Sequence, residues 1–369
     1  MSATSTGHRI GVGIHGVKLN LTCNYDRVCE YVVRLLGSQA GQAWACPDID
    51  VTAGWRTEET PGCDAPFGAP SSAGAYGKRM RLSTHELVWF DTHRDKELQL
   101  RFRPNGARFA FDVDYVYRPT PKKLAKYPDY EQRKFFSVLQ YLLYFPIAWF
   151  LERTRGWRLL HASAVAAGDR AVLVAGPGGV GKTTTCLALV GLAGMTFVAE
   201  NLLLVDGEQI HPVPEPIRLT DESLRLLGDE PLGLEDLSAV LGSRKHKSLF
   251  RLPTSVETAV ARPAAIFIPR FSDVGFIRPI PPGIASELLN ATNRLTLEIN
   301  DYSSYTAALD LLWPQAGNAQ RQIQAIEQLT GSTPCYALGI DRSAGVKPVV
   351  ERISECIGWP CAVASRVEC

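Results

Sequence analysis

Hydrophobic and polar residues alternate with period two through much of the first 120 positions. Residues 10–21 place Val, Ile and Leu between glycines and polar side chains, which predicts a strand pair joined by a tight turn. Residues 87–90, 98–102 and 107–117 alternate in the same way, at least in part, and predict neighbouring antiparallel strands with one solvated face. We therefore expect residues 1–125 to form a β-rich α+β N-terminal domain.

A long apolar segment with helical spacing follows this part of the chain. A helix is expected to begin near Tyr130 and to continue to Pro146 or beyond, so residues 126–155 are predicted to be a connecting helix. Its most apolar stretch, 135–151, spans 17 residues, fewer than the roughly 20 that cross a bilayer. Its aromatic residues suit a buried helix, and we expect no membrane association.

The pattern changes again in the second half of the chain. Residues 170–175 are a short apolar run bounded by glycine, which is typical of a buried parallel strand, and residues 183–192 have the spacing of a helix. Further short apolar runs predict strands at 196–199, 202–205 and 264–268. Strand, glycine-rich loop, helix and strand in this order predict an α/β sheet, which we assign to a second domain over residues 156–369.

Composition narrows the class of protein without naming it. Of the 369 residues, 46% are hydrophobic and 21% are charged, which are ordinary globular values. Lys and Arg number 39 against 38 Asp and Glu, so the chain has no bulk field that would attract nucleic acid or an anionic membrane. The nine cysteines include no C-x-x-C pair, and the N-terminus lacks an apolar signal core. Together these features indicate reduced thiols in the cytoplasm.

A glycine-rich loop in the predicted second domain is a candidate phosphate-binding site. Residues 176–183 read Gly-Pro-Gly-Gly-Val-Gly-Lys-Thr and match G-x-x-x-x-G-K-[ST] between a predicted strand and a predicted helix. Glycine permits the positive φ angles that turn N–H groups towards an anion, and a helix N-terminus adds unpaired donors. We predict that the loop binds a nucleoside triphosphate. Lys182 is expected to contact the β- and γ-phosphates, and Thr183 is expected to bind Mg²⁺. The residues expected to bind ATP are Gly176, Gly178, Gly179, Val180, Gly181, Lys182, Thr183 and Thr184.

An acidic residue follows the next predicted strand. Glu200 lies 18 residues after Lys182, which leaves room for one helix and a returning strand. A parallel strand beside the first would bring Glu200 to the edge where open α/β sheets bind ligands. Glu200 is predicted to be a general base, a metal ligand through water, or both, with a solvated strand-end carboxylate as the simpler alternative. Asp206 lies in a Val-Asp-Gly-Glu hairpin turn and is the weaker candidate.

A histidine precedes the strand that leads into the glycine-rich loop. His161 belongs to the segment 159–167, which predicts a hairpin with Gly168 and Asp169 as its turn. Its distance from the phosphate end of the sheet depends on strand register, which the sequence does not reveal. A lone histidine in an apolar segment is more often a satisfied core residue than a functional one.

Taken together, these residues resemble the HPr kinase/phosphorylase superfamily, and more closely its stand-alone HPr kinase-related members. Over residues 155–345 the resemblance rests on His161-Ala-Ser-Ala-Val, the 176–183 loop, the acidic strand end at Glu200, Pro214-Glu-Pro-Ile-Arg218-Leu and Ile266-Phe-Ile-Pro-Arg270. It implies a P-loop kinase fold shared with phosphoenolpyruvate carboxykinases, and ATP-dependent phosphorylation of a hydroxyl, which is a serine in the namesake proteins. It also implies that Glu200, His161 and Lys182 are catalytic.

One pair of residues departs from the family's pattern. Glu200 and Asn201 occupy the place of the family's Asp-Asp pair, so the implied metal set is Thr183, Glu200 and Asn201, with one negative charge fewer. Base catalysis by Glu200 survives this change, whereas a two-carboxylate metal site and the reverse phosphorylase reaction no longer follow from the resemblance. Related stand-alone members occur in peptide natural-product pathways, which favours a peptide, a carrier protein or a small hydroxylated metabolite as acceptor.

Basic residues that can close on a transferring phosphate lie further along the chain. Arg218 and Arg270 each end an apolar segment, and Arg244 belongs to a basic run that follows Gly242 and Ser243. Surface ion pairing explains Arg218 and Arg270 equally well, and a solvated charge run is the favoured explanation of the run that contains Arg244. The sequence does not select one of the three as the phosphate clamp.

The sequence therefore predicts an ATP- and Mg²⁺-dependent kinase with a hydroxyl-bearing substrate. The alternative is a nucleotide-dependent switch or partner-binding ATPase without a phosphoacceptor. A carboxykinase-like enzyme of small acids is a weaker third reading, because the chain is short for one and shows no second metal cluster. Homo-oligomerisation is compatible with the resemblance, since the namesake family forms higher oligomers.

Overall fold

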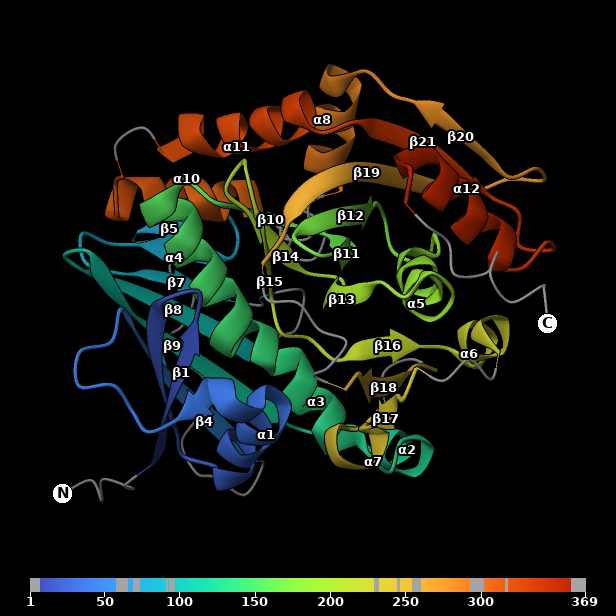
Figure 1. The fold of residues 1–369 in the computed structure, drawn as a ribbon. Helices are drawn as coiled ribbons and strands as arrows, with labels where there is room; N and C mark the ends of the chain where they lie inside the picture. Colours follow the sequence, from blue (N-terminus) through green and yellow to red (C-terminus); the bar gives the residue numbers. More distant parts are fainter. Residues whose placement is uncertain are drawn as a thin grey trace. The chain divides into compact units, whose positions relative to one another are not determined.

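The chain forms two compact units of mixed α/β structure (Figure 1). The computed structural model describes residues 7–57, 66–68, 74–90, 92, 97–228, 232–243, 246–253, 260–292, 302–315 and 318–359. The first unit comprises Met1–Arg155 with Leu295–Asn318, and the second comprises Gly156–Arg294 with Ala319–Cys369. The helix that the sequence pattern assigned to a connector belongs to the first unit. So does the later segment 295–318, which the pattern had assigned to the second domain.

The first unit is built on one mixed sheet of nine strands, in the order β3-β1-β2-β4-β9-β8-β7-β6-β5. Its elements are β1 (His8–Ile14), β2 (Val17–Cys23), α1 (Asp26–Leu36), a 3₁₀ turn (Gly37–Gln39), β3 (Ala40–Gly41), β4 (Ile49–Thr57), β5 (Ala75–Tyr76), β6 (Met80–Leu82), β7 (Leu87–Trp89), β8 (Leu98–Asn105), β9 (Arg108–Tyr117), α2 (Pro121–Lys126), α3 (Tyr130–Leu139), a π-helical turn (Gln140–Tyr144), α4 (Phe145–Arg155) and α10 (Tyr302–Leu312). β4 pairs in parallel with both β2 and β9, and the other pairs are antiparallel.

Local sequence predicted the first hairpin of this sheet and the strands β7, β8 and β9 correctly, but it did not predict β3, β4, β5 or β6. β1 and β2 pair around His15 and Gly16, whose φ angles of 50° and 73° suit a tight hairpin turn. The expected antiparallel neighbours are confirmed as β7, β8 and β9. The parallel pairs were not predicted, because they join segments that lie far apart in the sequence and carry no turn signal between them.

The long apolar segment is a continuous helix from α3 through the π-helical turn to α4. Trp149 of this helix packs edge-on against Phe111 at 5.3 Å, and Tyr305 of α10 stacks on Trp89 at 4.7 Å between ring centroids. Among the described residues it is the one helix long and apolar enough to cross a membrane, yet 94% of its most apolar window is buried. Such burial is the property of a core helix.

The second unit is built around a six-stranded sheet in the order β13-β11-β12-β19-β21-β20. Its elements are β10 (Arg158–Leu160), β11 (Ala162–Ala167), β12 (Arg170–Ala175), α5 (Lys182–Ala193), β13 (Thr196–Ala199), β14 (Leu203–Val205), β15 (Ile210–Pro212), β16 (Ile217–Leu219), α6 (Asp221–Leu227), β17 (Glu235–Asp236), α7 (Ser238–Leu241), β18 (Ser248–Arg251), β19 (Arg262–Phe271), β20 (Phe276–Pro279), α8 (Pro282–Ala291), α11 (Asn318–Ser332), β21 (Cys335–Ile340) and α12 (Lys347–Ile357). Two small sheets, β10-β14-β15 and β16-β18-β17, accompany it.

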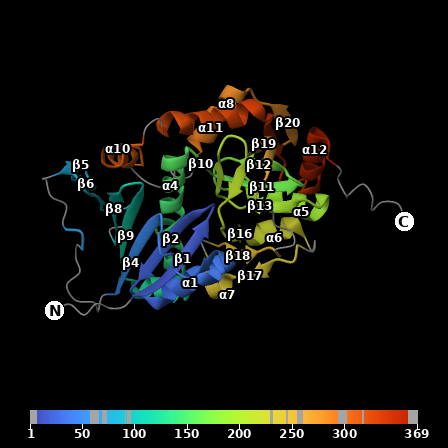
Figure 2. The ribbon, with the colours of Figure 1, turned by 60° about the vertical axis from the view of Figure 1, so that its left-hand side comes forward.

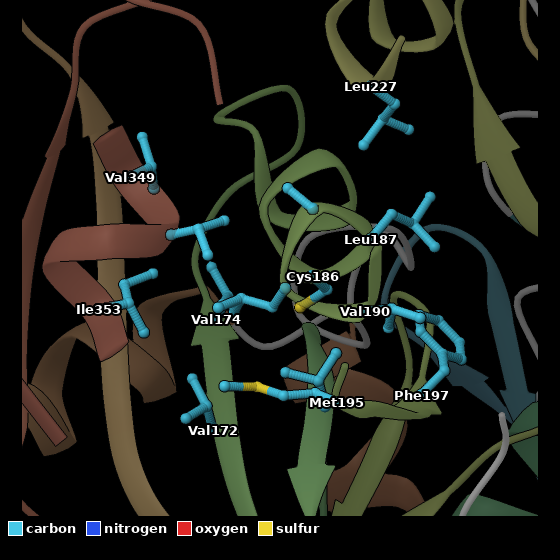
Figure 3. Close-up of a cluster of buried hydrophobic side chains, with 14 of the residues drawn as sticks. Val172, Val174, Cys186, Leu187, Val190, Met195, Phe197, Leu227, Val349 and Ile353 are labelled. Atoms are coloured by element: carbon cyan, nitrogen blue, oxygen red, sulfur yellow. The ribbon is translucent and has the colours of Figure 1, made fainter. Parts of the chain in front are cut away.

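Helices cover both faces of the six-stranded sheet (Figure 2). Val172 and Val174 of β12 pack in one apolar cluster with α5 and α12, whereas Ala171, Leu173 and Ala175 pack in another with α8 and α11. Figure 3 shows the first of these clusters between β12, α5 and α12. Because successive side chains of a strand point to opposite faces, an uninterrupted apolar run is what a strand covered on both faces requires. The prediction of a fully buried strand is confirmed.

The pairing of this sheet differs from expectation at one point. β12 pairs in parallel with β19, as expected for an α/β sheet, but its other neighbour is β11, through the predicted antiparallel hairpin. β13 pairs with β11 and not with β12. The expectation that the strand of Glu200 lies beside the strand of the glycine-rich loop is therefore wrong. Two antiparallel steps still leave β13 parallel in direction to β12, so both strands end at the same edge.

Replacement of Leu187 by alanine should lower the free energy of unfolding by about 2–5 kcal/mol. Leu187 of α5 is fully buried in the cluster of Figure 3, so its removal leaves a cavity. Urea denaturation followed by circular dichroism measures the loss. The control is Ile323→Ala on α11, where the side chain is 51% exposed and a change within about 0.5 kcal/mol is expected. Equal effects of the two substitutions would contradict this packing.

Candidate active site

The glycine-rich loop lies between the end of β12 and the start of α5. Gly179 and Gly181 have φ angles of 84° and 92°, in the left-handed region that side chains other than glycine rarely adopt. A Cβ atom on Gly181 would also lie 3.3 Å from Cδ1 of Ile340. The loop thus has the strand–loop–helix context that its motif requires, and α5 begins at Lys182 with its N–H groups directed back towards the loop.

Lys182 is buried, and its ammonium group lies inside the loop. Nζ donates hydrogen bonds to the carbonyl oxygens of Gly176 and Pro177, both at 2.9 Å, and lies 3.2 Å from Nε2 of His161. These contacts hold a positive charge at the centre of the turn. A cation in this position is suited to neutralise an anion bound by the surrounding backbone N–H groups.

His161 is brought to the loop by the register of the hairpin. Ala162 of β11 is paired with Ala175 of β12, so His161 stands opposite Gly176, whose N–H donates to the His161 carbonyl oxygen at 3.4 Å. The side chain of His161 lies between Lys182 and Asn201, with Nε2 2.9 Å from Oδ1 of Asn201. The histidine is thus part of a polar cluster.

Glu200 directly follows β13 and is buried, with 4% of its surface exposed. Its Oε1 accepts a hydrogen bond from Oγ1 of Thr183 at 2.9 Å, and its Oε2 accepts one from Oγ of Ser163 at 3.1 Å. Burial raises the pKa of the Glu200 carboxyl above its usual range, although the charges of Arg218 and Lys182 and the Thr183 hydrogen bond act in the opposite direction. The simpler alternative of a solvated carboxylate does not describe this residue.

Asn201 has a left-handed backbone conformation, and its side chain contacts a buried ion pair. Its φ of 62° lies in the left-handed region, which asparagine tolerates better than most residues. Its Nδ2 donates to Oε2 of Glu215 at 2.7 Å, and NH2 of Arg218 donates to the same oxygen at 3.1 Å. The Glu215 side chain is fully buried, so the Arg218 charge is what compensates it there.

This network sets the proton position on His161. Because the amide nitrogen of Asn201 faces the Glu215 carboxylate, its oxygen must face His161, and that oxygen needs a hydrogen on Nε2. The same Nε2 cannot then accept a hydrogen bond from the Lys182 ammonium 3.2 Å away. Lys182 is therefore held by the two loop carbonyl groups and not by the histidine.

The other residues predicted to belong to the site differ in how close they lie to the polar cluster. Thr184 donates to Ser223 of α6, and Arg218 lies close enough to Glu200 to lower its pKa. Arg270 of β19 lies over the ring of Phe276 on β20, with its guanidinium carbon 5.1 Å from the ring centroid. Asp206 accepts from backbone N–H groups of the β14–β15 turn, as its hairpin motif predicted. The basic run that includes Arg244 begins outside the described residues.

Two polar residues of the cluster were not assigned a role from the sequence. Ser163 lies two positions after His161 in one extended segment, so period-two alternation places both side chains on one face, and that spacing was a usable signal. Glu215 lies between two prolines, and Arg218 three positions later was its only local signal. Its contact with Asn201 depends on the fold, because it joins residues 14 positions apart in the chain.

Thr183 and Glu200 offer a hydroxyl oxygen and a carboxylate oxygen, which are donors of the kind that Mg²⁺ binds. Oγ1 of Thr183 and Oε1 of Glu200 lie 2.9 Å apart because a hydrogen bond joins them. Asn201 is turned towards His161 and Glu215 instead. Within the described residues no group of three His, Cys, Asp or Glu side chains is arranged to hold a metal ion, whereas Mg²⁺ is commonly held by one or two protein oxygens together with substrate phosphates.

The substitution Asn201→Asp should destabilise the protein by about 1–3 kcal/mol, because the new carboxylate would face that of Glu215 in a buried site. Adding Glu215→Gln should restore most of this loss, since glutamine carries no charge and its amide can donate to the new carboxylate. Urea denaturation of both single variants and the double variant gives the coupling energy, expected at about 0.5–3 kcal/mol. Additive losses would show that the contact with Glu215 does not select asparagine here.

Two sequence comparisons add no relative to this picture. The sequence matches no protein-family model, and a search of curated proteins finds no match. The structure establishes a mixed α/β fold with several sheets and a polar cluster at the end of β12. The function is therefore inferred from the chemistry of that cluster.

Proposed function

We propose that this chain is a cytoplasmic, ATP- and Mg²⁺-dependent kinase that transfers the γ-phosphoryl group to a hydroxyl of a peptide, a carrier protein or a small metabolite. We further propose that its second unit is a P-loop kinase domain of the HPr kinase-related type. One observation carries the proposal. Lys182, Thr183, Glu200 and His161 gather in one polar cluster at the end of the strand that leads into the glycine-rich loop.

In this proposal the loop binds and orients the triphosphate. Backbone N–H groups of the loop and of the first turn of α5 surround the β-phosphate, and the Lys182 ammonium neutralises β- and γ-oxygens. Thr183, with Glu200 acting through a water molecule, would hold Mg²⁺, which when bound would neutralise charge on the phosphate oxygens. Phosphoryl transfer needs little beyond such positioning and charge neutralisation.

Glu200 accepts the proton of the acceptor hydroxyl. A carboxylate whose pKa is raised by burial is a stronger base than an exposed one, and at neutral pH it can take a proton as the new bond to phosphorus forms. Ser163 and Thr183 fix its two oxygens. His161, whose Nε2–H is donated to Asn201, lies beside Lys182 and would border the bound phosphates.

Incubation with γ-labelled ATP and candidate hydroxyl-bearing peptides or metabolites tests this function. A mass gain of one phosphate group on an acceptor, dependent on Mg²⁺ and lost in Glu200→Gln, is the expected result. Absence of ATP binding to the wild-type protein would sink the proposal.

A nucleotide-dependent switch without an acceptor is the second candidate. The observation that favours it is Asn201, which cannot ionise and whose amide is engaged by His161 and Glu215. ATP hydrolysis at a rate unaffected by any acceptor, or ATP binding without turnover, would support this candidate over the kinase.

A further inference from the structure

Phe271 is an exposed aromatic side chain beside the glycine-rich loop. It is the last residue of β19, and 46% of its surface is exposed. Its ring edge approaches the loop closely, since a Cβ atom on Gly181 would lie 3.9 Å from Cε1 of Phe271. Single exposed apolar residues are common on protein surfaces, so it is the position of this ring beside the loop that calls for a functional explanation.

An arginine lies over this ring. The guanidinium carbon of Arg342, two residues after β21, is 5.0 Å from the centre of the Phe271 ring, and its side chain is 50% exposed. Arg342 also forms an ion pair with Glu222 in the first turn of α6. The backbone beneath is fixed, because Ser272 N–H donates to the Ile340 carbonyl oxygen at 3.0 Å. We call these two side chains the Phe271–Arg342 pair.

The sheet order places this pair opposite the polar cluster. β12, β19 and β21 are parallel, so the glycine-rich loop, Phe271 and Arg342 all lie at strand ends along one edge. Glu200 follows β13, on the other side of β12 from β19. A triphosphate with its terminal phosphate directed towards Glu200 therefore extends its nucleoside end towards β19 and β21.

We propose that the Phe271–Arg342 pair is the stacking site for the base of the nucleotide. The inference rests on the proposed function, because it needs a triphosphate on the loop. Aromatic rings and guanidinium planes both stack on nucleobases, and stacking is tolerant of base identity because every base has a π-face. Stacking by itself does not distinguish adenine from guanine, so we expect the site to bind both bases through their faces.

Isothermal titration of the full chain with ATP, GTP and inorganic tripolyphosphate tests the site. Phe271→Ala should weaken ATP and GTP binding by about 10- to 100-fold each and leave tripolyphosphate binding unchanged, because only the nucleotides carry a base. Phe271→Trp should retain the wild-type affinities. Val274→Ala, a change at a 69% exposed position of the same loop, is the matched control and should alter none of them.

The outcomes separate this inference from the proposed function. Wild-type binding of ATP that is unchanged in Phe271→Ala overturns the base site and leaves the kinase proposal standing. An equal loss of tripolyphosphate and ATP binding, in Phe271→Ala or in Arg342→Ala, also overturns it, because the pair would then act on phosphate or on the loop. Failure of the wild-type chain to bind either ATP or tripolyphosphate overturns both proposals together.

Discussion

Replacing Glu200 by glutamine should lower kcat for phosphoryl transfer by about 10²–10⁴-fold, the range expected for loss of a general base. Glutamine has nearly the same shape, and its amide can still meet the hydroxyl groups of Ser163 and Thr183. ATP affinity measured without metal should therefore be close to that of the wild-type protein. Steady-state kinetics and equilibrium titration of the same preparations separate the two effects.

The pH dependence of the wild-type enzyme should follow from the same carboxyl group. Because burial raises the pKa of Glu200, the basic form is depleted at acidic pH, and kcat/KM should rise as pH passes upward through that pKa. Glu200→Gln should show no such rise. The control is Glu208→Gln in the β14–β15 turn, which should keep both the rate and the profile. Equal turnover by Glu200→Gln and wild type would refute the assignment of the base.

Stability should change with pH in the opposite direction. A carboxyl group whose pKa is higher in the folded state stabilises the fold at low pH, and this contribution is lost as pH rises through the folded-state pKa. Glu200→Gln removes the buried charge, so its melting temperature relative to wild type should increase with pH. If Glu200→Gln is less active but more stable than wild type at alkaline pH, the Glu200 carboxylate lowers the stability of the fold while it serves the reaction.

Removal of the Lys182 ammonium should have the second large effect. We expect Lys182→Ala to lower kcat/KM by about 10³-fold or more, and to weaken ATP binding by about 10- to 100-fold, because one charge-assisted contact to the phosphates is lost. Lys182 also lowers the pKa of Glu200, so any residual activity should rise at higher pH than in the wild type. Titration calorimetry and steady-state kinetics give these values.

Two further substitutions assign the effect to charge. Lys182→Met keeps the aliphatic stem, and it should lose as much activity as Lys182→Ala if the ammonium group is responsible. Lys122→Met, at an exposed position of α2, should leave activity unchanged. Retention of wild-type kcat/KM by Lys182→Met would show that the buried lysine serves the loop's structure and not the phosphates.

The glycine-rich loop and its flanking elements could be predicted from sequence because their signals are local. Val172 and Val174 alternate with Ala171 and Leu173 within one short run, and the loop motif follows directly. The Gly168 turn likewise predicted the β11–β12 hairpin. Each of these features is specified by residues within a few positions of one another, where backbone preference and period decide the outcome.

The assembly of the site could not be read in the same way. Local pattern indicated that Glu200 ends a strand, but only the tertiary structure showed that β11 lies between that strand and β12. The register of the hairpin decided that His161 stands beside Lys182, and a shift of one residue would have turned its side chain to the other face.

By itself, the sequence determined the loop, its lysine and threonine, and the strand and helix that present them. Tertiary structure alone decided that Ser163 and Thr183 share the Glu200 carboxylate, and that the Asn201 amide donates to buried Glu215. The physical reason is that hydrogen bonds and charges act through space. Backbone conformation follows near neighbours in the chain, whereas burial and electrostatics depend on which distant segments the fold brings into contact.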